Sequence, residues 1–198
     1  MASLLVSGQE YIDPRVRRTR QMLEHALEDL LMKKPFEKIS VGDIADTATL
    51  NRATFYAHFV DKFDLLEGMV ATRFQDLLLS RGVTFDGTCP SALYGITLAV
   101  CDFLADIPYC FEQRQVAQHL EPAMVAIVRR MIGEGLSKNP LKSGVAPEMV
   151  AAALAGAIYG AAKQWARTAH RSDAQEAATN VTKLLSPMMA FGDVMPLQ

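Results

Sequence analysis

The sequence has no hydrophobic run long enough to cross a membrane. The longest stretch of apolar and glycine residues, 149–162, has 14 residues, whereas a transmembrane helix needs about 20. Cysteine is scarce too: the three cysteines form no CxxC pair and have no histidines at metal-ligand spacing. The opening M-A-S-L-L-V-S-G lacks the basic segment of a signal peptide. These absences predict a cytoplasmic protein with no membrane partner.

The motifs of the common enzyme classes are missing as well. The chain contains no HExxH, no G-x-S-x-G, no glycine-rich phosphate loop with G-K-[ST] and no dinucleotide-binding fingerprint. His119 and Glu121 could be imagined as a catalytic pair, but residues two apart point to different faces of a helix. The sequence therefore predicts no catalytic residues, no cofactor and no metal.

Neither sign of charge is in large excess. The 20 basic and 22 acidic residues give a formal net charge of -2, which argues against binding nucleic acid by bulk attraction. Any contact with DNA must therefore come from a few local side chains. Arginines gather near the start of the chain, and among them Arg15 and Arg18 are predicted to contact DNA.

Half of the residues are hydrophobic, and they recur at the i, i+3, i+4, i+7 spacing of helices that each bury one face. Together with proline and cap signals, this pattern predicts an all-α fold of about nine helices. The expected ranges are approximately 13–33, 41–48, 52–59, 61–82, 90–108, 109–119, 122–131, 147–170 and 172–187. We expect two domains, 13–66 and 67–198.

The segment 40–59 predicts a helix-turn-helix. Ser40 and Asp43 have the spacing of a capping box, which places a helix start at Val41. Thr49 and the following leucine form a short turn, and Asn51 is a good N-cap for a second helix. Two helices joined this tightly cross steeply, and in such units the second helix enters the major groove of DNA.

The side chains expected on the exposed face of the second helix suit DNA. Arg52 can pair with guanine and Ala53 can meet a thymine methyl, whereas threonine, tyrosine, histidine and lysine side chains can hold phosphate oxygens. A helical hairpin whose polar residues merely cover the core is the alternative. The predicted DNA-binding residues are Arg15, Arg18, Ser40, Asn51, Arg52, Ala53, Thr54, Tyr56, His58 and Lys62.

The segment from about Arg18 to Leu66 resembles the DNA-binding domain of the TetR family of bacterial transcriptional regulators. The chain departs from many members at Thr49, where they carry glycine. A narrower similarity, in D-P-R-V-R-R-T-R and N-R-A-T-F-Y-A-H-F, is to a subset that includes activators of dihydroxyacetone kinase genes. The matching residues are Thr19, Phe36, Ile39, Asp43-Ile44-Ala45, Ala48, Thr54-Phe55-Tyr56, His58-Phe59, Lys62 and Leu65-Leu66.

The resemblance implies a regulator, more often a repressor than an activator, that binds a double-stranded DNA operator as a homodimer. It also implies a C-terminal domain for dimerisation and for an unknown small-molecule effector. A helical adaptor controlled by a protein partner is the alternative. Candidate ligand-binding residues are Tyr94, Cys101, Phe111, His119, Met124, Tyr159 and Trp165, for each of which core packing is the competing explanation. Apolar stripes on the last two helices give the candidate dimer residues Leu154, Ile158, Ala161, Val181, Leu184 and Leu185.

Overall fold

A computed structural model describes residues 13–86, 90–106, 114–139 and 144–189. In these residues the chain forms eight α-helices, one short 3-10 helix and no strand, so the predicted all-α fold is confirmed. The elements are α1 (Pro14–Leu31), η1 (Phe36–Lys38), α2 (Val41–Thr47), α3 (Arg52–His58), α4 (Lys62–Ser80), α5 (Pro90–Ala105), α6 (Arg114–Lys138), α7 (Pro147–Ala166) and α8 (Ala174–Met189).

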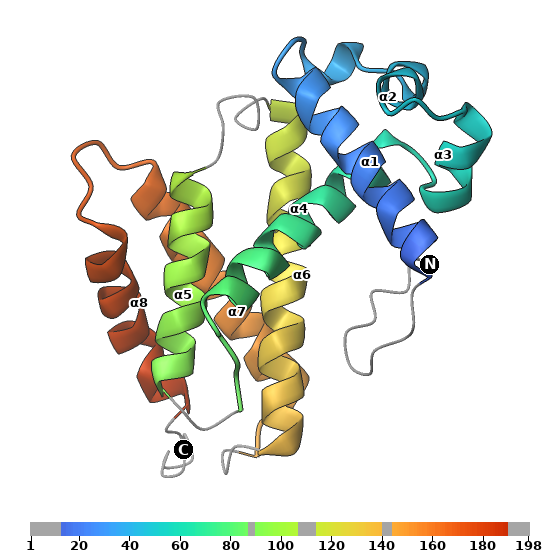
Figure 1. Ribbon diagram of the computed structural model, residues 1–198. Helices are drawn as coiled ribbons and strands as arrows, with labels where there is room; N and C mark the ends of the chain where they lie inside the picture. The colour runs from blue at the N-terminus through green and yellow to red at the C-terminus, as the bar shows by residue number, and fades with distance from the viewer. Residues whose placement is uncertain (1–12, 87–89, 107–113, 140–143, 190–198) are drawn as a thin grey trace.

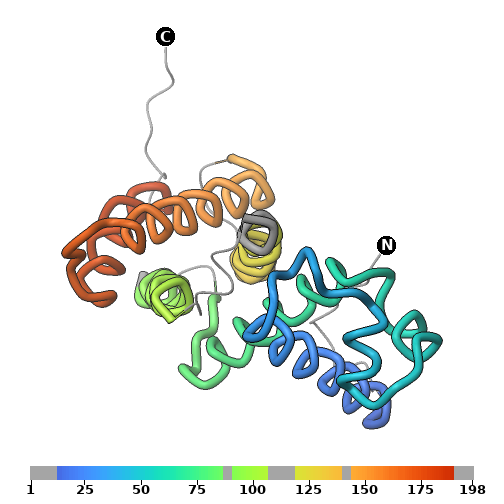
Figure 2. The backbone as a smooth tube through the Cα atoms, turned by 90° about the horizontal axis from the view of Figure 1, so that it is seen from above, coloured from blue at the N-terminus to red at the C-terminus, as the bar shows by residue number. Residues whose placement is uncertain are grey.

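The helices form two groups that α4 joins. We call α1, η1, α2 and α3 the head, and α5 to α8 the body. In the body, α5 packs against α7 and α8, while α6 packs against α7 and against α4. Figures 1 and 2 show the head at one end of the molecule and α8 at the other, with α4 running from the head toward α5. Because α4 is unbroken across residue 66, the domain boundary predicted there falls inside a helix.

One hydrophobic cluster extends through both groups. It includes Leu27 and Phe55 in the head, Phe74 on α4, and Ile96 and Ile158 in the body, all with no exposed surface. The edge of the Phe74 ring meets the Phe103 ring of α5 at 5.4 Å between centroids. Head and body therefore share apolar packing through α4 as well as a covalent connection.

The structure corrects the prediction of two helices around Pro122. Residues Arg114–Lys138 form one helix with Pro122 inside it, although proline removes a backbone donor and usually costs about 3 kcal/mol in a helix interior. Pro122 lies exposed, whereas Leu120 before it and Met124 after it are buried in the same core. Packing on both sides of the proline thus outweighs the local cost.

The start of α8 also differs from the prediction. Ser172 and Gln175 have the spacing of a capping box in the sequence, but in the structure Asp173 Oδ1 accepts a hydrogen bond of 2.7 Å from the Glu176 backbone N–H. Ser172 instead offers its carbonyl oxygen to Trp165 Nε1 at 2.9 Å. The helix begins one residue later than expected, and it continues to Met189 past the proline that was expected to end it.

Candidate nucleic-acid interface

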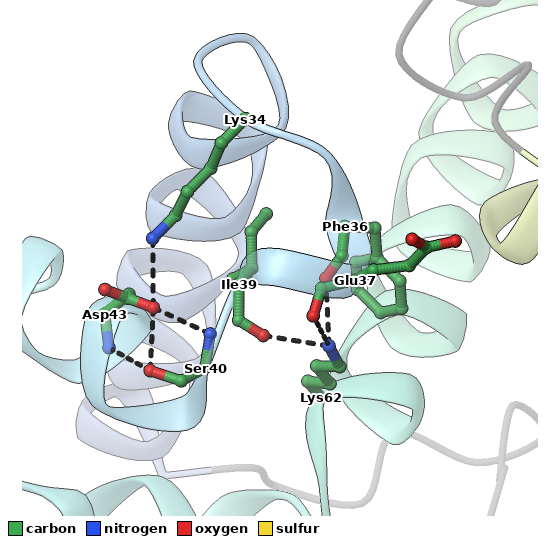
Figure 3. A network of polar contacts seen from close by, with 7 residues as sticks. All are labelled: Lys34, Phe36, Glu37, Ile39, Ser40, Asp43 and Lys62. Carbon is green, nitrogen blue, oxygen red and sulfur yellow. Dashed lines mark hydrogen bonds and ion pairs between the residues drawn. The ribbon is translucent and has the colours of Figure 1, made fainter.

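The capping box at the start of α2 is present as predicted. Ser40 Oγ accepts from the Asp43 backbone N–H at 3.1 Å, and Asp43 Oδ2 accepts from Ser40 N and from Ser40 Oγ, both at 2.7 Å. Lys34 Nζ lies 3.0 Å from the same carboxylate oxygen (Figure 3). These hydrogen bonds from Ser40, followed by Lys34, hold the pKa of Asp43 well below its usual range. The Ser40 side chain thus serves first as a cap for α2.

The turn between α2 and α3 needs a left-handed residue, and Thr49 supplies it with a φ of 59°. The Leu50 N–H donates to the Ala45 carbonyl at 2.8 Å, and the Thr49 N–H donates to the Asp46 carbonyl at 3.1 Å. These two bonds are the Schellman pattern, in which the residue after the C-cap is usually glycine. Threonine therefore adopts the same turn geometry that glycine serves in relatives, in a backbone region unfavourable for a β-branched residue.

Asn51 caps α3, as predicted, and fixes which face of this helix is exposed. Its Oδ1 accepts from the Thr54 backbone N–H at 2.6 Å and from Thr54 Oγ1 at 3.0 Å. Phe55 is fully buried, whereas Tyr56 keeps 57% of its surface exposed. Arg52 and Ala53 are exposed on the same short helix. The predicted division of α3 into an anchored face and an accessible face is therefore present.

Lys62, predicted to contact phosphate, has hydrogen-bond partners inside the protein. Its ammonium donates to three backbone carbonyls, those of Phe36 at 2.9 Å, Glu37 at 3.3 Å and Ile39 at 2.8 Å (Figure 3). An ammonium group has three donors, so all of them are used inside the protein. Burial lowers the pKa of Lys62 from its usual value. The side chain joins the start of α4 to η1, a role that the sequence pattern did not predict.

Arg20, one of the arginines near the start of the chain, makes contacts within the head that the sequence did not predict. Its guanidinium carbon lies 4.2 Å from the centre of the Phe59 ring, and its Nη1 donates to the His58 carbonyl at 3.2 Å. His58 is half-buried, and its burial, with a smaller effect of Arg20, lowers the pKa of its imidazole. Arg20 thereby fastens the end of α3 to α1, next to the predicted contact residue His58.

Arg15 and Arg18 lie exposed on the first turns of α1. Asp13 caps this helix by accepting from the Arg15 backbone N–H at 2.8 Å. Figures 1 and 2 show this end of α1 close to α3. The end of α1 that carries the predicted arginines thus lies near α3.

The candidate ligand-binding residues are spread through the body rather than gathered around one described cavity. Cys101, Met124 and Tyr159 belong to the core, and burial raises the pKa of Cys101 to about 11 and that of Tyr159 to about 12. Tyr94 and Trp165 are half-buried. Phe111 lies outside the described residues.

His119 contacts the head-proximal part of α4 instead of a pocket in the body. Its Nδ1 lies 3.0 Å from Glu67 Oε1, and its ring centre lies 4.8 Å from that of Phe63. A groove of about 480 Å³ opens nearby between the head and α6. Its lining includes Arg20, Phe59, Glu67, Ala126 and Ile127.

Most of the candidate dimer residues are buried within their own chain. Leu154 and Ile158 have no exposed surface, and Val181 and Leu185 keep only 8% each. A partner subunit cannot reach the first two, because they lie in the core of their own chain, in which α7 packs against α5, α6 and α8. Ala161 is half-buried, and Leu184 is 74% exposed. The outward face of α7 also carries Gly156 and Gly160, with open space beside both.

Within the described residues, no helix is both long and apolar enough to span a membrane.

The family model that describes bacterial regulatory proteins of the tetR family matches residues 24–69 of this chain. Residues 24–69 of this chain thus match the N-terminal domain of that family. The match contains the capped α2, the turn at Thr49 and the whole of α3, so the resemblance predicted from the sequence is confirmed.

Two curated relatives each match about a third of the chain. One is YxbF of Bacillus subtilis (strain 168), an HTH-type transcriptional regulator, which is 40% identical over 63 residues. The other is DhaS of Lactococcus lactis subsp. lactis (strain IL1403), the transcriptional activator of the dhaKLM operon, which is 33% identical over 60 residues. These matches cover 31% and 30% of this chain but only 17% and 32% of the two relatives.

Solved structures extend the likeness to the whole fold. The dihydroxyacetone kinase operon activator DhaS superposes with a TM-score of 0.54 at 18% identity, covering 89% of this chain and 98% of that one. A putative TetR-family regulator from Syntrophomonas wolfei gives a TM-score of 0.54 at 16% identity, covering 92% and 99%. The body therefore shares the fold of these two structures.

Proposed function

We propose that this protein is a sequence-specific DNA-binding transcriptional regulator. The observation that carries the proposal is the accessible face of α3, where Ala53 and Tyr56 are exposed on a short helix capped by Asn51. A helix presented in this way after a tight turn fits the major groove, where small side chains can meet the thymine methyl.

The test of DNA binding uses the purified full chain and the DNA upstream of its own gene. We expect fluorescence anisotropy to detect a complex that resists competition by unrelated DNA and that weakens as salt rises. Tyr56→Ala should weaken this complex, whereas Leu79→Ala, which truncates a side chain that is 76% exposed outside the head, should not. Equal binding of specific and unrelated DNA would contradict the proposal.

We also propose that the protein acts as a homodimer on a palindromic operator. The support is the exposed leucine Leu184 on α8 together with the open face around Gly156 and Gly160 on α7, which would let helices of two subunits approach closely. These helices lie at the end of the molecule away from the head (Figure 1). A two-fold dimer through them would leave both heads free to contact half-sites about 34 to 36 Å apart.

We further propose that a small-molecule effector controls operator binding, and that repression is the direction of control. Residues of α4 and α6 contact each other and line the groove beside the head, so a ligand that displaces either helix would move the head. Titrating the operator complex with the substrates of the enzymes encoded by neighbouring genes tests this. The alternative is activation, which DhaS performs at the dhaKLM operon, or control by a protein partner.

A further inference from the structure

The backbone conformation of Gly42 does not require glycine. It is the second residue of α2, and the glycines with positive φ among the described residues are Gly82 and Gly144. Glycine within a helix usually costs about 0.5 to 1 kcal/mol relative to alanine. Its retention at the start of a helix of seven residues therefore calls for a different explanation.

The Arg52 side chain supplies that explanation. A Cβ built on Gly42 would lie 2.4 Å from Arg52 Nη2, 3.0 Å from its Cζ and 3.1 Å from its Nε. All three distances are shorter than ordinary contacts, so the whole guanidinium, rather than one atom of it, occupies the space that a side chain at position 42 would take. Arg52 thus folds back from the first residue of α3 onto the first turn of α2.

The same guanidinium is not neutralised by the protein. Arg52 makes no ion pair within 4.0 Å with any residue that the structure describes, and the carboxylate nearest in sequence to Gly42, that of Asp43, is paired with Lys34. The absence of a side chain at position 42 therefore leaves room for Arg52 against α2 while its charge stays available. In helix-turn-helix units the first helix crosses the sugar-phosphate backbone, while the second enters the groove.

We infer that Gly42 is a positioning residue that holds Arg52 against α2, so that Arg52 contacts a DNA phosphate rather than a base. This inference rests on the proposed DNA-binding function and revises the base-reading role that the sequence suggested for Arg52. It leaves Ala53 and Tyr56 as the α3 side chains that face the bases. Gly42 then affects DNA binding without touching DNA itself.

The experiment is a double-mutant cycle of Gly42→Ala and Arg52→Ala, measured on a panel of operator base-pair variants at several salt concentrations. We expect Arg52→Ala to weaken all variants similarly and to reduce the slope of log affinity against log salt by about 0.9, the value for one lost phosphate contact. Gly42→Ala should weaken the wild-type arginine protein, yet have no further effect when residue 52 is already alanine.

Two controls keep the outcomes distinct. Gly133→Ala on α6 makes the same change where the nearest atom, Ala151 Cβ, would be 3.8 Å away, and it should leave affinity unchanged. Nuclear Overhauser contacts between the Arg52 side chain and the Gly42 α-protons should appear in the free protein and vanish in Gly42→Ala, whether or not DNA binds. Their absence in the unmutated protein would overturn the placement of Arg52.

The DNA-binding measurements distinguish failure of this inference from failure of the proposed function. If the unmutated protein prefers no DNA, the proposed function fails, while the nuclear Overhauser contacts still decide the placement of Arg52. If Arg52→Ala relaxes the preference at one base pair only, or if the two substitutions act additively, Arg52 reads a base and the inference is wrong.

Discussion

Thr49 is the residue at which the local backbone and the local sequence disagree most clearly. The turn between α2 and α3 requires its φ of 59°, and a non-glycine residue with left-handed backbone costs about 1 to 2 kcal/mol. The two turn hydrogen bonds and the burial of the flanking helices hold it there. The family resemblance identified this position as a departure from glycine, but only the structure shows that the turn keeps its shape.

Thr49→Gly should therefore stabilise the protein. Relief of the left-handed strain is partly offset by the greater freedom of glycine in the unfolded chain, so we expect a gain of roughly 0.5 to 1 kcal/mol in the free energy of unfolding. Denaturant titration followed by circular dichroism measures it. Thr47→Gly, two residues earlier in the helical backbone of α2, should destabilise the protein by a similar amount. A loss of stability in Thr49→Gly would show that no strain is stored there.

Lys62 illustrates the reverse case, in which an apparently functional residue stabilises the fold. Replacing its ammonium by the methionine thioether in Lys62→Met would leave three carbonyls of the η1 region without their donor. We expect the free energy of unfolding to fall by about 1.5 to 3 kcal/mol, given the usual strength of hydrogen bonds to charged groups.

Lys38→Met is the matched control, because Lys38 is exposed on η1 and should contribute little to stability. Thermal unfolding distinguishes the two variants. If Lys62→Met unfolds like the unmutated protein but shows a smaller salt dependence of operator binding, Lys62 contacts phosphate after all.

At the scale of helices and turns, the sequence predicted the features that depend on residues close together in the chain, such as helix caps. The cap of α2 at Ser40, the cap of α3 at Asn51 and the anchoring role of Phe55 all follow from local spacing, and all are present. The continuity of α6 through Pro122 could not be predicted in this way, because it depends on the packing of Leu120 and Met124 against other helices. Contacts between distant segments, such as Arg20 with His58, leave no signal in a local pattern.

The cap of α8 gives a prediction at this scale. Asp173→Ala removes the acceptor for the Glu176 backbone N–H and should lower the free energy of unfolding by about 1 kcal/mol. Ser172→Ala keeps the carbonyl that bonds to Trp165 Nε1, so it should have little effect. Thermal melts of the two variants decide between Asp173 and Ser172 as the cap, and a larger loss in Ser172→Ala would restore the original prediction.

At the scale of the whole molecule, solvent exposure distinguishes a leucine that packs in the core, Leu154, from a leucine that is available for a subunit contact, Leu184. Leu154 has no exposed surface, whereas Leu184 is 74% exposed on α8. The apolar stripes in the sequence contain both residues and do not distinguish them. The arrangement of α5, α7 and α8 decides which side of each stripe faces inward, and that arrangement involves residues far apart in the sequence.

We therefore expect Leu154→Asp to impair folding and Leu184→Asp to impair dimerisation. A carboxylate at position 154 would be buried without a partner, so we expect a loss of several kcal/mol and largely unfolded protein. Leu184→Asp should keep its helical circular dichroism spectrum and thermal transition but sediment as a monomer with weakened operator binding. A folded Leu184→Asp dimer in analytical ultracentrifugation would move the interface away from this part of α8.

The hydrophobic cluster that joins the head to the body has a consequence for cooperativity. Because α4 contributes Leu65 and Leu66 to one end of that cluster and Phe74 to the other, neither group of helices can melt without exposing apolar surface of its neighbour. Heat should therefore unfold the protein in a single step, and a fragment cut within α4 would lose packing partners on the other side of the cut. The rigidity of the head, which we propose contacts DNA, thus depends on its packing with α4 and, through α4, with the body.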